Sequence, residues 1–356
     1  MVKHVSRRKF IKYMGAAALS AGSLNLPGRV LGQSKTYTIK FATPAPESHP
    51  WYFPKAMTPF KEEVERESKG KLLIEFYPNQ ILVKVGGELQ SIRSRIVQAV
   101  NFATVWQPGL FPLHEVWYLP GACTASAKFN NDMYRELLPK YFEKEWAQHD
   151  LHVLGWYIPT AYGVYHLHTP INKVEDFSGI DLMSWSPQQN KVLSKLKVDL
   201  RAGTLMEMYD NLQKKLADGV AHNAATVVTY KLHELGKPGY YSQVGGLGGG
   251  DAFYAISKSY YDGLPKELKT IIDKASRKWL QDSAGTAYDT AENEAAGKMQ
   301  AVGVKYIDWS AAEKKRLRDD YLLPTLKQWS EAMDAKGLQA TTLVDAIVKA
   351  REAGGR

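Results

Sequence analysis

Cysteine is nearly absent from this 356-residue chain, which contains only Cys123 and therefore cannot form an internal disulfide bond. Its folded state must be stabilised by a hydrophobic core instead. A nucleophilic role is one interpretation of this thiol. The simpler one is a small buried apolar residue, because free cysteine is among the most buried residue types.

Long apolar runs and familiar catalytic motifs are also missing. After residue 32 no stretch is long and apolar enough to span a bilayer, so we expect the rest of the chain to be soluble. A Gly-x-Ser-x-Gly elbow and a His-Glu-x-x-His helix do not occur. His166 and His168 face one side of an expected strand that offers no third metal ligand. We therefore expect no catalytic residue, no metal and no cofactor.

The excess of positive charge is concentrated at the N-terminus. The chain has 46 Lys and Arg against 37 Asp and Glu, a formal net charge of +9. Six of the basic residues and none of the acidic ones lie in residues 1–32, which leaves a net charge of +3 without a basic stripe. Such a small charge gives no reason to expect a nucleic-acid partner.

Residues 1–32 have the features of an export signal. The basic segment SRRKFIK at residues 6–12 precedes a moderately apolar run at 13–26 that is rich in Gly, Ala and Ser. This arrangement, with small residues before a cleavage site near Gly32, is typical of secretory signals. The paired arginines resemble the twin-arginine export motif. We expect cleavage near Gly32 and a periplasmic location, with an uncleaved amphipathic anchor as the alternative.

Strand-like and helix-like segments alternate in two series after the signal. Their order predicts an α/β protein with mainly parallel, helix-covered sheets in two separately cored lobes, with a ligand cleft between them. The glycine-rich stretch 245–250 fits a flexible crossing between lobes, because it lacks the features of a phosphate loop. The expected strands are 36–42, 72–77, 99–104, 153–157, 162–167, 180–185 and 252–257, and the expected helices 55–69, 88–98, 188–196, 206–216 and 266–300.

Several short motifs resemble, in their order and spacing, those of TRAP (tripartite ATP-independent periplasmic) transporter solute-binding proteins of the DctP type. Each motif is weak alone, but together they cover nearly all of the chain after the signal. They are Phe41-Ala42, ESHP at 47–50, FYPNQ at 76–80, Pro170-Ile171 with EDFSG at 175–179, EMYDNLQ at 207–213 with Asp218-Gly219, and ISK at 256–258 with LPKE at 264–267.

This resemblance implies a two-lobed periplasmic binding protein fold with a long bracing helix that closes over one ligand, often an organic acid. Small and large membrane subunits would then import that ligand with an ion gradient. The chain itself would be a monomer or homodimer and not an enzyme. The expected parts are lobe I at 34–158 and 247–286, lobe II at 159–246 and 287–325, and C-terminal helices at 326–356 packing on lobe I.

The chain departs from the family pattern where the family grips a ligand carboxylate. The final arginine of the family's D-L-K-G-L-K-I-R motif usually makes that grip, and alignment on Gly179 places Met183 there. A second family arginine has no counterpart among residues 162–165. The asparagine after the Asp-Gly motif aligns with His222, which Asn223 follows. Either another cation replaces this grip, or the ligand is not a simple carboxylate.

Aromatic side chains are frequent at the loops and strand ends that face the family's cleft. Flat rings suit an aromatic or apolar ligand, or a cation held against a ring face. Trp185 is the leading candidate because it lies two residues past Met183, on the same strand face. Arg201 is the candidate for a cation that replaces the missing arginine. The alternative interpretation is that Arg201 is a solvated residue at a strand end, without a role in ligand binding. The expected ligand-binding residues are Trp185, Arg201, His222, Asn223, Trp106, Tyr162, Met183, His49 and Trp51.

The sequence therefore predicts an extracytoplasmic solute-binding protein. It would capture a small organic solute, aromatic or weakly acidic, by lobe closure and deliver it to TRAP membrane subunits. Two alternatives stay open. One is an exported enzyme that acts on a small organic molecule, because catalytic carboxylates can be far apart in sequence. The other is an ABC-type or chemoreceptor-linked binding protein.

Overall fold

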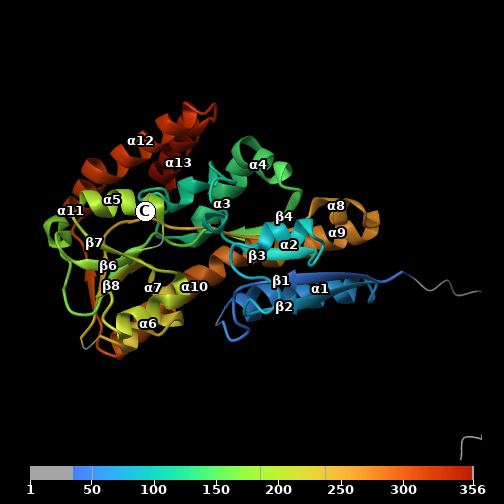
Figure 1. The fold of residues 1–356 in the computed structure, drawn as a ribbon, viewed down its shortest axis with the longest axis horizontal. Coiled ribbons are helices and arrows are strands. Elements are labelled where there is room, and N and C mark those ends of the chain that lie inside the picture. Colours follow the sequence, from blue (N-terminus) through green and yellow to red (C-terminus); the bar gives the residue numbers. More distant parts are fainter. Residues whose placement is uncertain (1–34, 50, 185, 237, 355–356) are drawn as a thin grey trace, which may run out of the picture. The chain divides into compact units, whose positions relative to one another are not determined.

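Two β-sheets organise the part of the chain that the structure describes (Figure 1). The computed structural model describes residues 35–49, 51–184, 186–236 and 238–354. Residues 36–356 form one compact unit. The expected export signal and Trp185 lie outside the described residues.

The first sheet has five strands in the order β2-β1-β3-β10-β4. Strand β1 pairs in parallel with β2 and β3, whereas β10 runs antiparallel to β3 and β4. Every residue of β10 is buried, as expected for a strand covered on both faces. The strands are β1 (Tyr37–Ala42), β2 (Leu72–Tyr77), β3 (Ala99–Phe102), β4 (Leu151–Tyr157) and β10 (Ala252–Ser257).

The second sheet has six strands in the order β11-β9-β5-β8-β6-β7. Strand β6 is parallel to β7 and β8, and β9 is parallel to β11, whereas β5 is antiparallel to β8 and β9. The strands are β5 (Gly163–His166), β6 (Asp181–Ser184), β7 (Asp199–Ala202), β8 (Gly219–His222), β9 (Tyr240–Gln243) and β11 (Lys305–Asp308).

Both sheets are mixed, so the expectation of mainly parallel sheets was wrong in part. The antiparallel pairings involve β5 and β10, which each follow a short crossing from the other sheet, whereas β11 arrives through the long helix and pairs in parallel. A strand that arrives by a short crossing is not tied into a strand–helix–strand unit, which is the connection that makes neighbours parallel. The chain crosses at residues 158–162 and 244–251, and the two crossings hydrogen-bond to each other through Tyr162 and Gly248.

Helices cover the sheets, and serine hydroxyls cap several of them. Ser126, Ser186 and Ser310 each accept the backbone N–H of the residue three positions on, which satisfies a donor at the helix start. Among the described residues, no helix is both long and apolar enough to cross a membrane. The α-helices are α1 (Thr58–Glu67), α2 (Glu88–Arg93), α3 (Ala127–Leu137), α4 (Glu143–Gln148), α5 (Pro187–Lys195), α6 (Met208–Gln213), α7 (Ala224–Thr229), α8 (Lys258–Asp262), α9 (Lys266–Ala275), α10 (Ser283–Ala301), α11 (Ala311–Leu317), α12 (Leu323–Asp334) and α13 (Ala340–Gly354).

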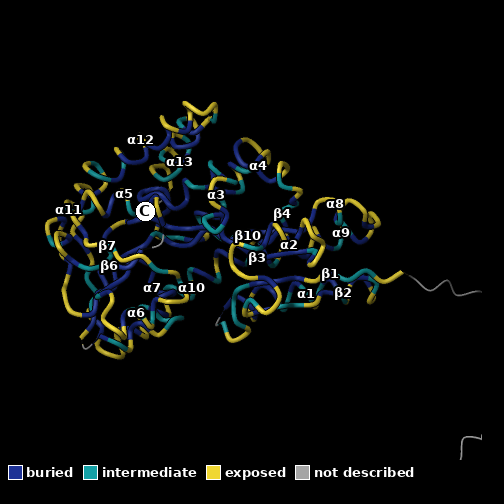
Figure 2. Tube along the Cα trace, viewed as in Figure 1, coloured by how far each residue is buried: buried dark blue, intermediate teal, exposed yellow. Residues whose placement is uncertain are grey.

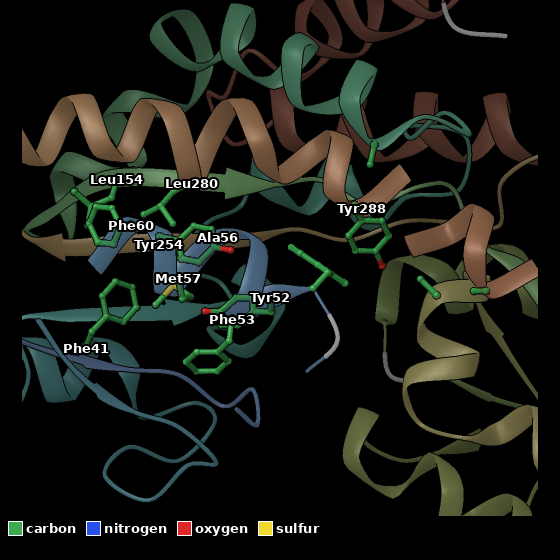
Figure 3. Packing of buried hydrophobic residues seen from close by; sticks show 14 of the residues in the cluster. Phe41, Tyr52, Phe53, Ala56, Met57, Phe60, Leu154, Tyr254, Leu280 and Tyr288 are labelled. Atoms are coloured by element: carbon green, nitrogen blue, oxygen red, sulfur yellow. The ribbon is translucent and has the colours of Figure 1, made fainter. Parts of the chain in front are cut away.

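One continuous helical segment, Lys266–Ala301, braces elements of both sheets. It runs from α9 through the π-helical turn η9 (Ser276–Asp282) into α10, as the sequence predicted. Gly155 of β4 permits the close approach, because a Cβ there would lie 2.4 Å from the carbonyl oxygen of Leu280. Figure 3 shows Leu280 beside Leu154 of β4, and Tyr288 further along the same helix. Helix α10 then packs on α3 and α7.

The hydrophobic core is shared between the sheets, which corrects the expectation of two separately cored halves. Its largest cluster includes Phe41 and Tyr254 of the first sheet, Val220 of the second, and Tyr288 of α10. The long helix causes this continuity because it buries one side against both sheets. Figure 2 shows the buried strands in dark blue and the exposed outer turns of the helices in yellow.

Two smaller clusters each belong to one sheet. The cluster beside the first sheet includes Trp329 of α12 and Leu343 of α13, so the C-terminal helices pack there. The cluster beside the second sheet includes Val164 and Trp309. The exact residue limits of the two lobes stay a prediction.

Candidate functional site

A cavity of about 130 Å³ lies where strands of both sheets end. Ala103 follows the carboxyl end of β3, and Tyr157 ends β4. From the second-sheet side come His222, the last residue of β8, and residues of α7, which begins two positions later. Ligand sites in α/β proteins favour such strand ends and interfaces between sheets. The topology therefore places the cavity where a solute would be expected to bind.

Aromatic rings form much of the cavity wall. The Trp51 ring meets those of Tyr157 and Tyr288 edge to face, at centroid distances of 5.1 and 5.2 Å. The Tyr162 ring, also in the lining, stacks on His222 at 4.1 Å, with 23° between the ring planes. Such arrangements fix the orientation of each ring through its quadrupole. The wall is thus a preorganised set of flat faces and hydroxyl groups.

The two histidines of the cavity are uncharged at neutral pH. Burial lowers the pKa of His49 to about 4 and that of His222 to about 3. The Nδ1 atom of His222 accepts the backbone N–H of Asn223 at 2.9 Å, so the neutral ring carries its proton on Nε2. The Nδ1 atom of His49 accepts the backbone N–H of Tyr52 at 3.4 Å. Both rings can therefore donate a neutral hydrogen bond.

Asp251 supplies the only charged side chain in the described lining of the cavity. It is 5% exposed and lies at the end of the crossing that leads into β10. Its carboxylate accepts hydrogen bonds from the backbone N–H of Thr104 at 2.8 Å, from the Thr104 hydroxyl, and from the Tyr118 hydroxyl at 2.7 Å. Burial raises the pKa of Asp251, and these donors oppose the rise. No Lys or Arg lines the described part of this cavity.

The long helix holds α7 in place beside the cavity. Asn223 caps α7 by accepting the N–H of Thr226 at 3.0 Å, and its side-chain amide donates to the Tyr288 hydroxyl at 2.7 Å. The Glu292 carboxylate of α10 accepts the N–H groups of the first two residues of α7 at 2.9 and 2.8 Å. Burial raises the pKa of Glu292 to about 7. One face of α10 thus fixes a helix that lines the cavity.

Five residues predicted from the sequence meet at this cavity: His49, Trp51, Trp106, Tyr162 and His222. Asn223 lies one step behind it, where it caps α7. Trp185 lies outside the described residues.

The structure does not bring Met183 or Arg201 to the cavity. The Met183 side chain is fully buried in the core, where its Sδ atom accepts from Asn211. The Arg201 guanidinium, on the edge strand β7, is exposed and pairs with Asp181 at 2.7 Å. Arg201 lies on the edge strand β7, two strands away from β8, and the Met183 side chain belongs to the core cluster.

Several residues of the cavity were missed by the sequence predictions. Local periodicity gives no sign that a tyrosine inside a long helix, such as Tyr288, faces a ligand site. Asp251 could have been suspected from the sequence, because it directly follows the glycine-rich stretch 245–250 that was predicted to cross between the lobes. The missed residues include Tyr52, Asn101, Tyr118, Tyr157, Tyr230, Asp251 and Tyr288.

The glycine-rich crossing and Cys123 have structural roles beside the cavity. Gly246 and Gly248 adopt positive φ angles, and a Cβ on Gly249 would lie 2.3 Å from the Cys123 sulfur. Cys123 itself is buried, and burial raises its pKa to about 12, which does not favour a reactive thiolate. The described residues contain no group of three His, Cys, Asp or Glu side chains that could hold a metal ion.

A second hollow of about 550 Å³ adjoins the cavity and shares four of its lining residues. Val105 and Trp106 contribute from the first-sheet side, and Leu205 and Met206 from the second-sheet side. Met206 is 41% exposed. These four side chains therefore lie between the cavity and a wider, more open space.

Known proteins match this chain along most of its length. Residues 41–331 match the DctP family model, described as bacterial extracellular solute-binding protein, family 7. The C4-dicarboxylate-binding periplasmic protein DctP of Rhodobacter capsulatus is 26% identical over 348 residues, which covers 94% of this chain and 98% of that protein.

Solved structures share the fold. One is a TRAP solute binding protein of an unidentified marine microbe, specific for aromatic acid ligands and in complex with 3-hydroxybenzoate. It has 21% identity and a TM-score of 0.81, and covers 90% of this chain and 100% of that chain. Another is a TRAP solute binding protein from Rhodoferax ferrireducens T118 in complex with copurified benzoate. It has 23% identity and a TM-score of 0.78, and the match covers 89% of this chain and 99% of that chain.

A two-sheet α/β fold with a ring-lined cavity between the sheets and a helix bracing both defines a solute-binding protein. The chain belongs to the bacterial extracellular solute-binding protein family 7, the DctP type. The family and the two-lobed periplasmic binding protein fold that the sequence predicted are thereby confirmed.

Proposed function

We propose that this chain is the periplasmic solute-binding protein of a TRAP transporter and that it captures one small, ring-sized organic solute. The observation that carries this proposal is the cavity between the sheets, with its wall of aromatic rings. Its volume of about 130 Å³ is close to that of an engineered cavity of ~150 Å³ that holds one benzene molecule. A single six-membered ring is therefore the natural size of the solute.

The relatives support a ring-bearing solute. The two solved structures named above hold 3-hydroxybenzoate and benzoate. The curated relative from Rhodobacter is named for C4-dicarboxylates instead, so membership of the family alone does not set the ligand. In this chain the rings of Trp51, Tyr157 and Tyr162 favour a flat solute over an extended dicarboxylate.

Binding without turnover fits the chemistry of the cavity. Asp251 is the only carboxylate in its described lining, so the site lacks the pair of acids that glycosidase-type chemistry requires. The neutral His222 stacks on Tyr162 and faces no serine or cysteine nucleophile in that lining. This lining therefore supports binding better than it supports the exported-enzyme alternative.

Capture would proceed by closure of the two sheets over the solute. The solute enters through the 550 Å³ hollow, past Trp106 and Met206, and contacts rings of both sheets at once. Closure is favoured only by as much as the solute prefers the closed state, and contacts from both sides supply that preference. The closed form would then dock on the small and large membrane subunits. The signal in residues 1–32 would be removed near Gly32 during export.

Filling the cavity tests this proposal. In Thr229→Trp a large ring would occupy the cavity from α7, so solute binding measured by calorimetry should be lost while circular dichroism stays unchanged. The solute for this test is first identified by native mass spectrometry of protein purified from its own host. Thr342→Trp, on an exposed turn of α13, is the matched control and should bind normally. Unchanged binding by Thr229→Trp would contradict the assignment, and so would chemical conversion of the bound solute.

A further inference from the structure

A separate cavity of about 180 Å³ lies against both crossings between the sheets. Thr160 and Ala161 of the first crossing and Gly245 and Gly246 of the second form part of its wall. The rest of the wall comes from the loop before α3 and from single residues of β9, α10, α11 and α13. Its described lining shares no residue with that of the solute cavity, so its ligand is a question apart from the proposed function.

Hydrogen bonds hold the walls of this second cavity together. The N–H of Ala161 donates to the carbonyl of Thr124 at 2.7 Å, and the N–H of Gly121 donates to the carbonyl of Gly246 at 3.1 Å. Arg351 reaches the same loop from α13, because its Nη1 atom donates to the carbonyl of Gly121. Both crossings, the loop before α3 and α13 therefore form one connected frame, and a ligand would find its contacts already in place.

Two polar groups in this wall are buried without a partner. The Nε atom of Arg351 and the hydroxyl of Thr160 make no hydrogen bond within the described part of the chain. Thr160 is 2% exposed, so bulk water does not reach it freely. A guanidinium N–H can only donate, so the Nε atom requires an acceptor. Buried polar groups without a protein partner are uncommon, and a bound water or ion is a usual explanation.

The charge that the cavity offers is positive. Arg351 stays protonated although burial lowers its pKa, and no Asp or Glu of the described chain pairs with it. Lys314 also lines the cavity, half-buried, and pairs with Asp308. Glu292 is the one acidic side chain in the described lining, but its oxygens accept the first two N–H groups of α7. Burial raises the pKa of Glu292 to about 7, which reduces the negative charge that it sets against an anion.

The arrangement of the donors favours an anion with several oxygens. Arg351, Thr160 and Lys314 belong to three different elements, namely α13, the first crossing and α11. A ligand that accepts from all three needs more than one acceptor atom, which carboxylate, phosphate and sulfate provide and a halide does not. Guanidinium groups form their strongest hydrogen bonds with such oxygens. The volume of about 180 Å³ is several times the ~30 Å³ of one water in the liquid, so a small oxyanion fits.

We propose that this second cavity binds a small oxyanion, a phosphate, a sulfate or a short carboxylate, between Arg351 and Thr160 at the crossings.

Titration calorimetry on the whole protein, in a buffer without oxyanions, tests this proposal. The probes are the sodium salts of phosphate, sulfate, acetate and chloride at matched ionic strength. At least one oxyanion should bind saturably and at least about tenfold more tightly than chloride, because bidentate, charge-assisted hydrogen bonds require paired oxygens. Phosphate or sulfate as the tightest probe would identify a tetrahedral oxyanion, and acetate as the tightest would identify a carboxylate.

Variants locate the binding. Arg351→Gln should lower the affinity for the tightest oxyanion at least about tenfold, because it removes the unpaired guanidinium. Lys349→Gln is the matched control: it removes the same charge from an exposed position on the same helix and should change the affinity less than about twofold. General salt effects on the protein surface act on both variants alike, so the difference between them reports the cavity.

Thr160→Val gives an independent measurement that does not depend on α13. It keeps the shape of the side chain and removes only the buried hydroxyl, so it should lower oxyanion affinity about threefold or more. If Arg351→Gln fails to fold, this variant decides the question.

Three results would overturn the proposal. They are the absence of saturable oxyanion binding, chloride binding as tight as that of the oxyanions, and unchanged oxyanion affinity in Arg351→Gln and Thr160→Val. Each of them would leave the solute-binding function standing, because the two cavities have no described lining residue in common. That function is decided separately by the Thr229→Trp experiment.

Discussion

At the scale of single residues, His222 shows how burial decides charge. It stacks on Tyr162, and burial lowers its pKa to about 3. In the unfolded chain its pKa returns to about 6.5. Between about pH 3 and pH 6.5 the unfolded chain therefore binds a proton that the folded chain does not. Stability contributed by the neutral ring is present above this window and is lost as the pH falls through it.

Replacing His222 by Phe should reduce this loss, because the variant keeps a stacked ring and removes the titrating group. Between about pH 6 and pH 4 the unfolding free energy of the unmodified protein should fall more steeply with decreasing pH than that of the variant. The two slopes should differ by up to ~1.4 kcal/mol per pH unit. Urea unfolding at a series of pH values measures both slopes. Burial raises the pKa of Glu88 and Glu292 to about 7. These two carboxyl groups therefore increase the unfolding free energy as the pH falls, but they do so equally in both proteins. Parallel slopes would show that His222 is not titrated as described.

Arg201 gives a second prediction at this scale. Its guanidinium is exposed and pairs with Asp181, away from the cavity. Exposed ion pairs contribute only ~0–1 kcal/mol to stability. Arg201→Ala should therefore leave solute affinity within about twofold and unfold at nearly the same urea concentration. A large loss of affinity by calorimetry would instead support the role in ligand binding that the sequence suggested.

Sequence reasoning found one part of the site and missed another for identifiable reasons. His49, Trp51, Trp106, Tyr162 and His222 lie at loops and strand ends, and such positions are visible in the sequence. Met183 aligned with a ligand-binding arginine, and its side chain instead fills the core. The tyrosines around Asp251 join the site only through tertiary packing, which no local pattern records.

At the scale of elements, the long helix approaches β4 very closely near the site. Leu280 of η9 lies directly over Gly155, where there is no room for a side chain. Along α10 the same segment carries Tyr288 and Glu292, which hold α7 beside the cavity. A displaced helix would therefore disturb both the core and the site.

Gly155→Ala should destabilise the protein by roughly 1–3 kcal/mol, because the new Cβ would push against backbone atoms of Leu280. Gly297→Ala is the matched control on an exposed turn of α10, where a Cβ would meet nothing within 4 Å. It should stabilise by ~0.5–1 kcal/mol, since alanine favours the helix. Chemical denaturation measures both changes. Equal effects of the two substitutions would contradict this packing.

Most elements were predictable because their periodicity is strong. The strands at 37–42, 72–77 and 252–257 and the helical segment 266–301 agree with the sequence to within one residue. Strand direction was not predictable to the same extent. It depends on which distant strands pair after a crossing, as β5 and β10 show. The short strands β8 and β9 and helix α7 carry too few residues for a clear pattern.

At the scale of the whole molecule, the account depends on movement of the two sheets relative to each other. The shared core under the long helix keeps them together, and the chain passes between them at 158–162 and 244–251. Gly246 and Gly248 already adopt positive φ angles in the second crossing. We expect the change on closure to be concentrated in these crossings.

The most direct test is a distance across the cleft. Lys84 and Lys191 are exposed, and their neighbours Val85 and Asn190 line the 550 Å³ hollow from the first-sheet side and the second-sheet side. Spin labels on Lys84→Cys and Lys191→Cys can be attached selectively, because Cys123 is buried. Pulsed electron resonance with and without the copurified solute should show one shorter, narrower distance when the solute is bound. Identical distance distributions in the two states, with the solute tightly bound, would contradict capture by closure.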